Sequence, residues 1–375
     1  MRLSGFALLF VISITCAFAQ VDIESRRMLL AQTGESVWHS EETPSALGFF
    51  WFNQNNFPWT NTALRIIYAG VYLDTELSYF VAGNTNSAIG FGAGGGFYLN
   101  SITPYVNGER LAHEEFNGDD VGGRVFANQT IPNPTPLPLN LRGTYAISQK
   151  FYRKSQTTED FNLPPDFYVQ TMQAELRFGG IEPGLLSKRG AELYLEADAN
   201  YRSGFEPFGP ASPPTVLGHQ TTYQRTFGSL AAKLPAGPTT VSARLCGGWG
   251  EQLDELSAWK IGGNLVNLQP LAYTLHGYYT REFYTDRFAL ANLALSVPLV
   301  HKHNLAAHFY GDWALARGVP PEVRDAHNYF GVGTGLSFRA LWDTDWLVSY
   351  GYGINAVRNG DRGGQEVGLA LEKKF

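Results

Sequence analysis

Residues 328–340, NYFGVGTGLSFRA, decide the fold class of this 375-residue chain. From Phe330 to Phe338, every second residue is apolar or threonine, and the residues between them are glycine or serine. A spacing of two is the spacing of a β-strand whose faces meet different surroundings. The same alternation recurs at 345–355, DWLVSYGYGIN, and at 190–202. One face of each segment is apolar, and the other is small, polar or charged.

The length of these segments and the rhythm of their connections favour a membrane barrel. They run for ten or more residues, close to the ~9–11 that a tilted strand needs to cross a bilayer, whereas an ordinary strand averages ~5–6. A soluble sandwich also alternates, with its polar face in water. Short periplasmic turns and long external loops are, however, typical of outer-membrane barrels. The connections near 133–138, 234–239, 300–303 and 341–344 are short, and those near 154–165, 203–217, 251–285, 317–327 and 355–364 are long.

Counting back from the C-terminus predicts an all-β, transmembrane antiparallel β-barrel of sixteen strands, an even number as bacterial barrels have; fourteen remains compatible with the pattern. The expected strands lie near 364–375, 345–355, 328–340, 303–316, 286–299, 238–250, 218–233, 190–202, 166–179, 139–152, 117–128, 101–111, 87–99, 75–83, 62–73 and 46–54.

The composition excludes several other classes of protein. Only 17% of residues are charged, 14% are aromatic, and the net charge is −6, which argues against a disordered chain and against a nucleic-acid binder. Beyond the first 20 residues, no apolar run approaches the ~18 residues of a membrane-spanning helix. We therefore expect outer-membrane lipid, and no nucleic acid, among the partners.

The N-terminus has the pattern of a signal peptide. A basic start is followed by an apolar stretch from Gly5 to Cys16 and by Ala17-Phe18-Ala19, which predicts cleavage before Gln20. The expected organisation is a signal peptide at 1–19, an N-terminal tail at 20–45 and the barrel at 46–375. Because cleavage removes Cys16, Cys246 remains alone, and we expect neither an intrachain disulfide nor a cysteine metal site.

Glycines form stripes on one face of several expected strands. Such stripes let another backbone approach closely. We expect them to face the lumen and to leave room there. They comprise Gly90, Gly92, Gly94 and Gly96; Gly331, Gly333 and Gly335; and Gly351 with Gly353.

The last strand ends in an aromatic residue on an apolar row. Phe375 shares its face with Leu371, Leu369 and Val367, which resembles the C-terminal assembly signal of outer-membrane barrels. Lys373 departs from that pattern, since a further apolar residue is usual there. We interpret Phe375 as the assembly signal.

A more specific resemblance covers about 255–375. Leu275-His276-Gly277-Tyr278 is followed by Ser296-Val297-Pro298-Leu299 and by Tyr310-Gly311-Asp312-Trp313-Ala314. In order and spacing these segments are similar to the bacterial surface antigen family, the BamA/TamA-like outer-membrane assembly barrels. The resemblance implies that the long loop before the fifth strand from the end folds into the lumen. It implies a loop motif of His276, Gly277, Tyr278 and Arg281, with Tyr310 and Asp312 as its partners on the lumen face.

Two departures from the family bear on function. His276 stands where the family has an arginine, and Arg281 is close enough in sequence to take its place. The stretch from Gln20 to Ala46 is too short for a domain, so we expect a member that lacks the periplasmic POTRA domains.

The resemblance implies transport or insertion of protein or lipid at the bacterial outer membrane, with a client or accessory protein as a further partner. The alternative is a passive pore or a structural barrel with a fixed plug loop. A barrel hydrolase is a third hypothesis, but no spacing rule places a serine beside His308. We expect no enzymatic activity, no catalytic or metal residues and no cofactor.

Overall fold

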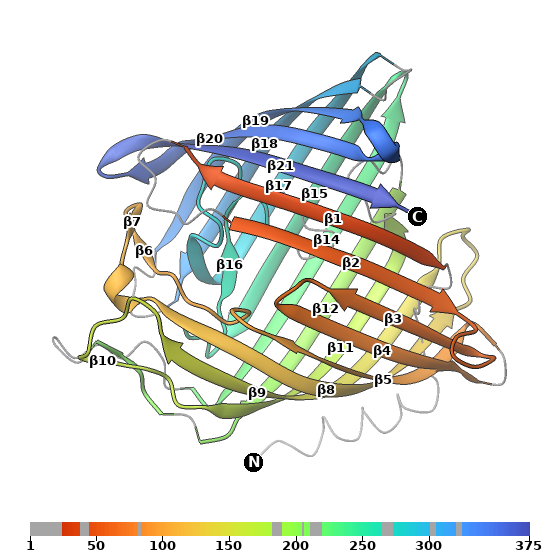
Figure 1. Cartoon of the computed structure of the whole chain (residues 1–375), viewed down its shortest axis with the longest axis horizontal. Coiled ribbons are helices and arrows are strands. Elements are labelled where there is room, and N and C mark those ends of the chain that lie inside the picture. Colours follow the sequence, from red (N-terminus) through yellow and green to blue (C-terminus); the bar gives the residue numbers. More distant parts are fainter. Residues whose placement is uncertain are drawn as a thin grey trace.

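A computed structural model describes residues 25–37, 45–81, 84–181, 190–204, 206–210, 220–263, 273–300, 305–319 and 325–375. The expected signal peptide, 1–19, lies outside these residues. The described chain forms a closed antiparallel barrel of sixteen strands (Figure 1). This confirms the predicted fold class and strand count.

The barrel strands are β1 (Arg26–Ser36), β2 (Ser45–Asn55), β3 (Thr62–Tyr68), β4 (Tyr72–Phe80), β5 (Ser87–Gly96), β8 (Phe116–Ile131), β9 (Leu139–Lys154), β11 (Phe167–Ile181), β12 (Gly190–Arg202), β14 (Thr222–Ala236), β15 (Thr239–Glu251), β17 (Phe283–Val300), β18 (Leu305–Gly318), β19 (Ala326–Arg339), β20 (Asp345–Arg358) and β21 (Asp361–Lys374). The connections carry β6 (Tyr105–Val106), β7 (Glu109–Arg110), β10 (Phe161–Asn162), β13 (Gly209–Pro210) and β16 (Trp259–Ile261), with 3₁₀ turns at Ala112–Glu114 and Leu341–Asp343.

The barrel closes by pairing its first strand with its last. The ladder between β1 and β21 runs from Met28 opposite Lys374 to Ser36 opposite Glu366. At one end the Phe375 amide donates to the Arg27 carbonyl at 3.0 Å, and at the other the Ser36 hydroxyl donates to the Gln365 carbonyl at 2.9 Å. The described residues therefore leave no free edge along this ladder.

Exposure alternates along the barrel strands as the sequence pattern predicts. Outward side chains are apolar and exposed, such as Phe91 at 59% and Val332 at 43%. Their neighbours along the strand point to the inner face, where charged residues such as Glu76 and Glu366 are buried. Because the exposed row is apolar, it suits contact with lipid. The described residues contain no helix with the length and hydropathy of a membrane span.

Two details upstream differ from the sequence-based prediction. The expected tail at 20–45 contains β1, so the barrel begins at Arg26 rather than at residue 46. The inward row of β1 mixes Met28 and Leu30 with Gln32, and its outward row carries Arg27 and Glu35 at its ends, so neither face has a uniform polarity.

The expected strand at 101–111 is not part of the barrel wall. It contains the small hairpin of β6 and β7, and Asn107 and Gly108 turn between them with positive φ angles of 50° and 78°. Asn-Gly is the strongest short-range signal for a tight hairpin. The prediction of sixteen strands is thus right in number, although one predicted strand was wrong and β1 was missed.

Candidate functional site

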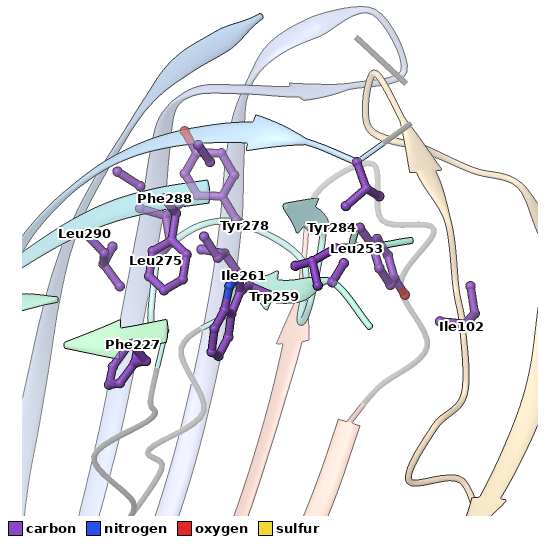
Figure 2. Close-up of a cluster of buried hydrophobic side chains, with 14 of the residues drawn as sticks. Ile102, Phe227, Leu253, Trp259, Ile261, Leu275, Tyr278, Tyr284, Phe288 and Leu290 are labelled. Atoms are coloured by element: carbon purple, nitrogen blue, oxygen red, sulfur yellow. The ribbon is translucent and has the colours of Figure 1, made fainter. Parts of the chain in front are cut away.

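The connection between β15 and β17, residues 252–282, is the candidate site, and its first attachment is aromatic. Trp259 of β16 packs on Phe227 of β14 and Phe288 of β17, with ring centroids 5.9 Å from each. Tyr273, later in the same connection, packs on Phe288 at 5.0 Å. Figure 2 shows Trp259 beside Phe227 within this buried cluster. One side of the loop is thus held by burial of apolar surface.

The second attachment is polar and centres on His276. Its backbone amide donates to Asp312 Oδ2 of β18 at 2.8 Å, and its Nδ1 lies 2.5 Å from the same oxygen. The imidazole stacks on Tyr310, also from β18, with ring centroids 4.6 Å apart. Asn292 of β17 donates to Asp312 Oδ1 at 2.7 Å, so both carboxylate oxygens are engaged. The structure therefore brings together His276, Tyr310 and Asp312, which the resemblance implied as partners.

Gly277 lies where no other residue could replace it without movement. Its φ is +80°, and a Cβ there would collide with the backbone of Tyr352 and Gly353 in β20. Its amide faces Glu366 Oε2 of β21 at 3.3 Å. A Cβ on Gly331 of β19 would lie 2.6 Å from the His276 carbonyl oxygen. The glycines of β19 and β20 thus admit the loop backbone to the inner face of the barrel.

Tyr278 is fully buried and is fixed by its hydroxyl group. This hydroxyl donates to Asn355 Oδ1 at 2.8 Å and lies 3.3 Å from the Phe330 carbonyl oxygen. Its ring packs edge-on against Phe283 and Tyr329. A tyrosine placed in this way satisfies its one polar atom while burying its ring.

The arginine that binds the loop is Arg358 of the barrel wall and not Arg281. Arg281 is exposed with φ +61°, and no hydrogen bond or ion pair of its side chain occurs among the described residues. Arg358, at the end of β20, is 0% exposed and binds both carboxylate oxygens of Glu282 at 2.9 Å. It also donates to the Gly277 carbonyl at 3.3 Å and lies 3.6 Å from the Tyr279 ring centroid.

Sequence reasoning missed Arg358 and Glu282. They are separated by 76 residues, and Arg358 lies far beyond the motif that drew attention to the loop. Alternation could not have found Arg358, because it places position 358 on the face of Tyr350 and Ile354, whereas a register shift between Gly353 and Val357 turns Arg358 to a buried position. A buried charge needs a partner, but the sequence does not say which one.

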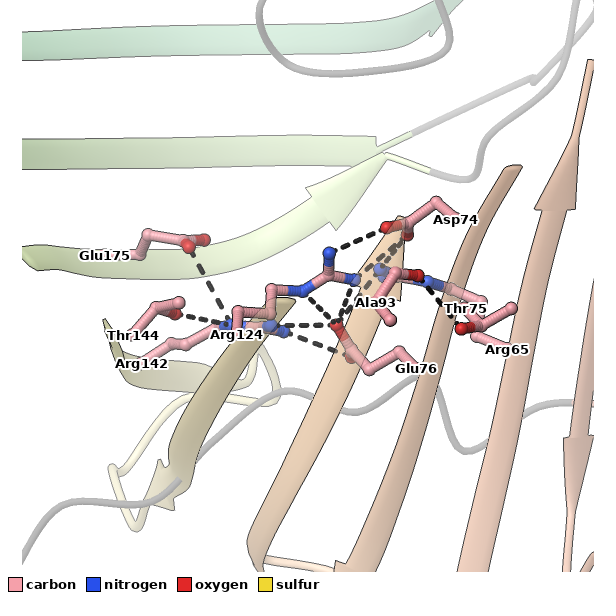
Figure 3. Close-up of polar contacts among 9 residues, drawn as sticks. All are labelled: Arg65, Asp74, Thr75, Glu76, Ala93, Arg124, Arg142, Thr144 and Glu175. Atoms are coloured by element: carbon pink, nitrogen blue, oxygen red, sulfur yellow. Dashed lines mark hydrogen bonds and ion pairs between the residues drawn. The ribbon is translucent and has the colours of Figure 1, made fainter. Parts of the chain in front are cut away.

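The opposite inner wall satisfies its own charges (Figure 3). Arg124 of β8 binds Asp74 of β4 at 2.7 Å, and Arg142 of β9 binds Glu76 of β4 at 2.9 Å. Arg65 of β3 lies 3.1 Å from Glu76. The ion pairs therefore tie together strands that lie one, two and three positions apart in the wall, without any loop residue.

The glycine stripe of β5 serves this network. A Cβ on Gly92 would lie 2.8 Å from the Arg124 guanidinium carbon, and a Cβ on Gly90 would collide with the Phe126 ring. The expected room for a backbone is thus filled by side chains in β5. The stripes of β19 and β20 instead meet the backbone of His276 and Gly277.

His308 on β18 lies between two serines, a contact that spacing did not reveal. Its Nδ1 is 2.8 Å from Ser296 Oγ, and its Nε2 is 2.7 Å from Ser337 Oγ. Ser337 is 1% exposed, and no described carboxylate contacts the imidazole. The arrangement supplies two hydrogen bonds to a buried ring, and no carboxylate among the described residues orients that ring. Within the described ranges, no cluster of three or more histidine, cysteine, aspartate or glutamate residues could hold a metal ion.

Phe375 follows β21 and is 68% exposed, beyond the outward row of Val367 and Leu369. Its ring lies 5.2 Å from the Lys373 ammonium nitrogen. The hydrogen bond from its backbone amide to the Arg27 carbonyl fixes the end of the closing ladder. Its role as an assembly signal stays a prediction.

Comparison with known proteins shows which solved structures have a similar fold. No protein-family model matches the chain, and no curated protein has a significant match to it. Among solved structures, CdiB from Acinetobacter baumannii is 10% identical with a TM-score of 0.62, over 95% of this chain and 61% of that one. CdiB from Escherichia coli is 12% identical, with a TM-score of 0.60 over 94% and 64%.

BamA from Haemophilus ducreyi lacking POTRA domains 1–3 is 11% identical, with a TM-score of 0.60 over 94% of this chain and 71% of that one. The chain thus spans less than two thirds of either CdiB chain. With the closed wall and the exposed apolar row described above, these likenesses identify the protein as an outer-membrane β-barrel with the fold that CdiB and BamA share.

Proposed function

We propose that this barrel acts in transport or insertion of protein or lipid at the outer membrane, and that the described parts of the loop, 252–263 and 273–282, are its moving part. The single observation that supports the proposal is the division of the loop's contacts. One attachment, around Trp259, is apolar, and the other, around His276 and Glu282, is a set of directional polar contacts. The hydrogen bonds of His276 can be exchanged for bonds to water, because a typical hydrogen bond contributes only about 0.5–1.5 kcal/mol net, whereas apolar burial holds the loop nearby.

The partners proposed with this function are outer-membrane lipid and a client or accessory protein. The apolar outer row suits the lipid. The likeness to CdiB and BamA supports a partner protein only by analogy, because a shared fold does not fix function. The proposal assigns no catalytic step to the barrel.

A passive or structural barrel with a fixed plug is the second candidate, and one contact favours it. Arg358 and Glu282 form a buried, two-point ion pair between wall and loop. Breaking a pair of this kind costs several kcal/mol, about 3–5 when one partner is removed. A loop held so firmly would keep the lumen closed.

Reconstitution in vesicles separates the two candidates. Purified barrel is placed in liposomes, and two activities are measured: insertion of a urea-unfolded porin, scored by protease protection, and transbilayer movement of a fluorescent phospholipid. We expect at least one activity to exceed that of empty liposomes, and Arg358→Ala to change it. Stable single-channel steps in planar bilayers, with neither activity, would instead support the passive barrel.

A further inference from the structure

The wall of the barrel is interrupted at β3 and β4. β3 has 7 residues and β4 has 9, whereas β8 and β9 have 16 each. A tilted strand needs ~9–11 residues to cross the hydrocarbon layer, so β3 is too short to do so. Figure 1 shows this hairpin ending well before the neighbouring end of β2.

The tip of this hairpin is apolar and exposed. This tip is Ala69-Gly70-Val71, and Tyr68, Val71 and Leu73 around it are 52%, 47% and 46% exposed. The hairpin of β20 and β21, on the same side of the barrel, instead turns through Asn359 and Gly360. An apolar, exposed tip belongs at the level of the lipid-facing row.

Beyond this tip, residues 45–49 of β2 have a paired strand on only one side. Its ladder with β1 extends to Ser45, opposite Gly34. Its ladder with β3 begins only at Phe50, opposite Tyr68. Within the described ranges, no backbone group pairs with residues 45–49 on the side that faces β3.

An open edge in a bilayer is costly because lipid cannot hydrogen-bond to exposed amides and carbonyls. Acyl chains packed there would cover the apolar surface but leave those groups unpaired. An extended polypeptide supplies the missing donors and acceptors through its own backbone. The space of two missing strands, roughly 10 Å at ~4.8 Å a strand, admits one added strand or a hairpin.

We propose that residues 45–49 of β2 form a docking edge for an extended polypeptide segment, which pairs with β2 above the tip of β3 and β4. The partner has alternating side chains, apolar on the outward face, because Phe50 and Tyr68 flank the edge outside. The ladder between β1 and β21 offers no such edge in this structure, since its pairing is continuous from Met28 to Ser36. The inference rests on the proposed function for its cargo class, a polypeptide.

The test uses disulfide formation with a synthetic peptide in purified barrel that carries Cys246→Ala. The peptide copies residues 326–339 of β19 with cysteine in place of Val332. Cysteine is placed in the barrel by Gly48→Cys at the edge, where a Cβ has no neighbour closer than 3.8 Å. Val125→Cys, on an outward site of β8 paired on both sides, is the matched control. Leu369→Cys on β21 reports on the closing ladder.

Gly48→Cys should react at least about tenfold faster than either other variant, which corresponds to ~1.4 kcal/mol of added affinity. The same peptide methylated at alternate backbone amides should lose that advantage, because methylation removes main-chain pairing but keeps the apolar side chains. Equal rates at the three sites, a fastest reaction at Leu369→Cys, or an advantage that survives methylation would each overturn the proposal. So would rapid Gly48→Cys dimers without peptide, which would assign the edge to a second copy. The vesicle assays are independent of this result, so a failed docking edge and a failed transport function are distinguishable.

Discussion

Buried charged groups on two parts of the inner barrel wall find their partners in different ways. On β3, β4, β8 and β9, buried carboxylates pair with arginines of other strands in the same wall, and the glycines of β5 make room for these side chains. On β18, β20 and β21, buried Asp312, Arg358 and Glu366 meet residues of the loop. The first wall is complete by itself, whereas the second is complete only when the loop is docked.

This difference shows where the molecule can move. Removing the loop from the second wall would leave three charged groups without the loop partners that they now have. The first wall would be unchanged. We therefore expect substitutions in the second wall to affect loop docking and stability together, and substitutions in the first wall to act on the wall alone.

The largest expected effect is that of Arg358→Ala. It leaves Glu282 buried without its guanidinium, so the free energy of unfolding should fall by about 3–5 kcal/mol. Urea titration of the barrel folded in detergent measures this. Arg153→Ala is the control, because Arg153 pairs with Asp119 at a more exposed site, with side chains 43% and 15% exposed, and should lose only about 0–1 kcal/mol. Equal losses would show that the second wall does not depend on its pair with the loop.

Alanine substitutions in two glycine stripes should distinguish a glycine that contacts the loop from one that contacts only the barrel wall. Gly331→Ala pushes against the His276 carbonyl, and Gly92→Ala pushes against Arg124 and the Thr75 carbonyl. Each should cost about 1–3 kcal/mol through overpacking. Only Gly331→Ala should speed trypsin cleavage after Lys260 in the loop. Faster cleavage in Gly92→Ala as well would mean that both walls support the loop.

His276→Ala should have a smaller effect, about 0.5–1.5 kcal/mol for the lost side-chain contact with Asp312. His276→Arg should be tolerated, because a guanidinium can also bind that carboxylate. Arg281→Ala should stay within about ±0.5 kcal/mol, since Arg281 is exposed. These values come from the same urea titrations. A larger loss in Arg281→Ala than in His276→Ala would return the motif role to Arg281.

A separate expected effect is a pH dependence that arises from Lys260. Burial, reinforced by the charge of Arg281, lowers the pKa of Lys260 from 10.5 to about 7. The unfolded chain therefore holds this proton between pH 7 and 10.5 while the docked loop releases it, so stability should rise with pH in that window. Unfolding titrations at pH 7 and 9.5 measure the slope. Lys260→Met should flatten it, and an unchanged slope would exclude Lys260 as its source.

Alternation in the sequence predicted most of the barrel because each long strand has one lipid-facing and one inner face. It failed at β1, where Arg27 and Glu35 point outward and Leu30 points inward. It failed again at 101–111, where Asn107-Gly108 makes a turn. In both cases, the alternation of apolar and polar residues does not indicate whether the segment belongs to the barrel wall.

The site was only partly predictable for a related reason. His276, Tyr310 and Asp312 were found through sequence segments that occur in this chain in the same order as in the family that it resembles. Arg358 could not be found in that way, because its partner Glu282 is fixed by the three-dimensional path of the loop and not by spacing. The interruption at β3 and β4 was also not predicted, since the expected strand 62–73 was too long and the expected strand 75–83 was displaced by three residues.

The closing ladder has a consequence for the order of folding. Ser36 and Gln365 are 329 residues apart, so the bond between them can form only after nearly the whole chain has been made. Until then β1 presents an unpaired edge, a state in which strands readily join the wrong neighbour. Contacts of such long range also slow folding. The time that the newly made chain spends as an open sheet is therefore set by its last fifteen residues.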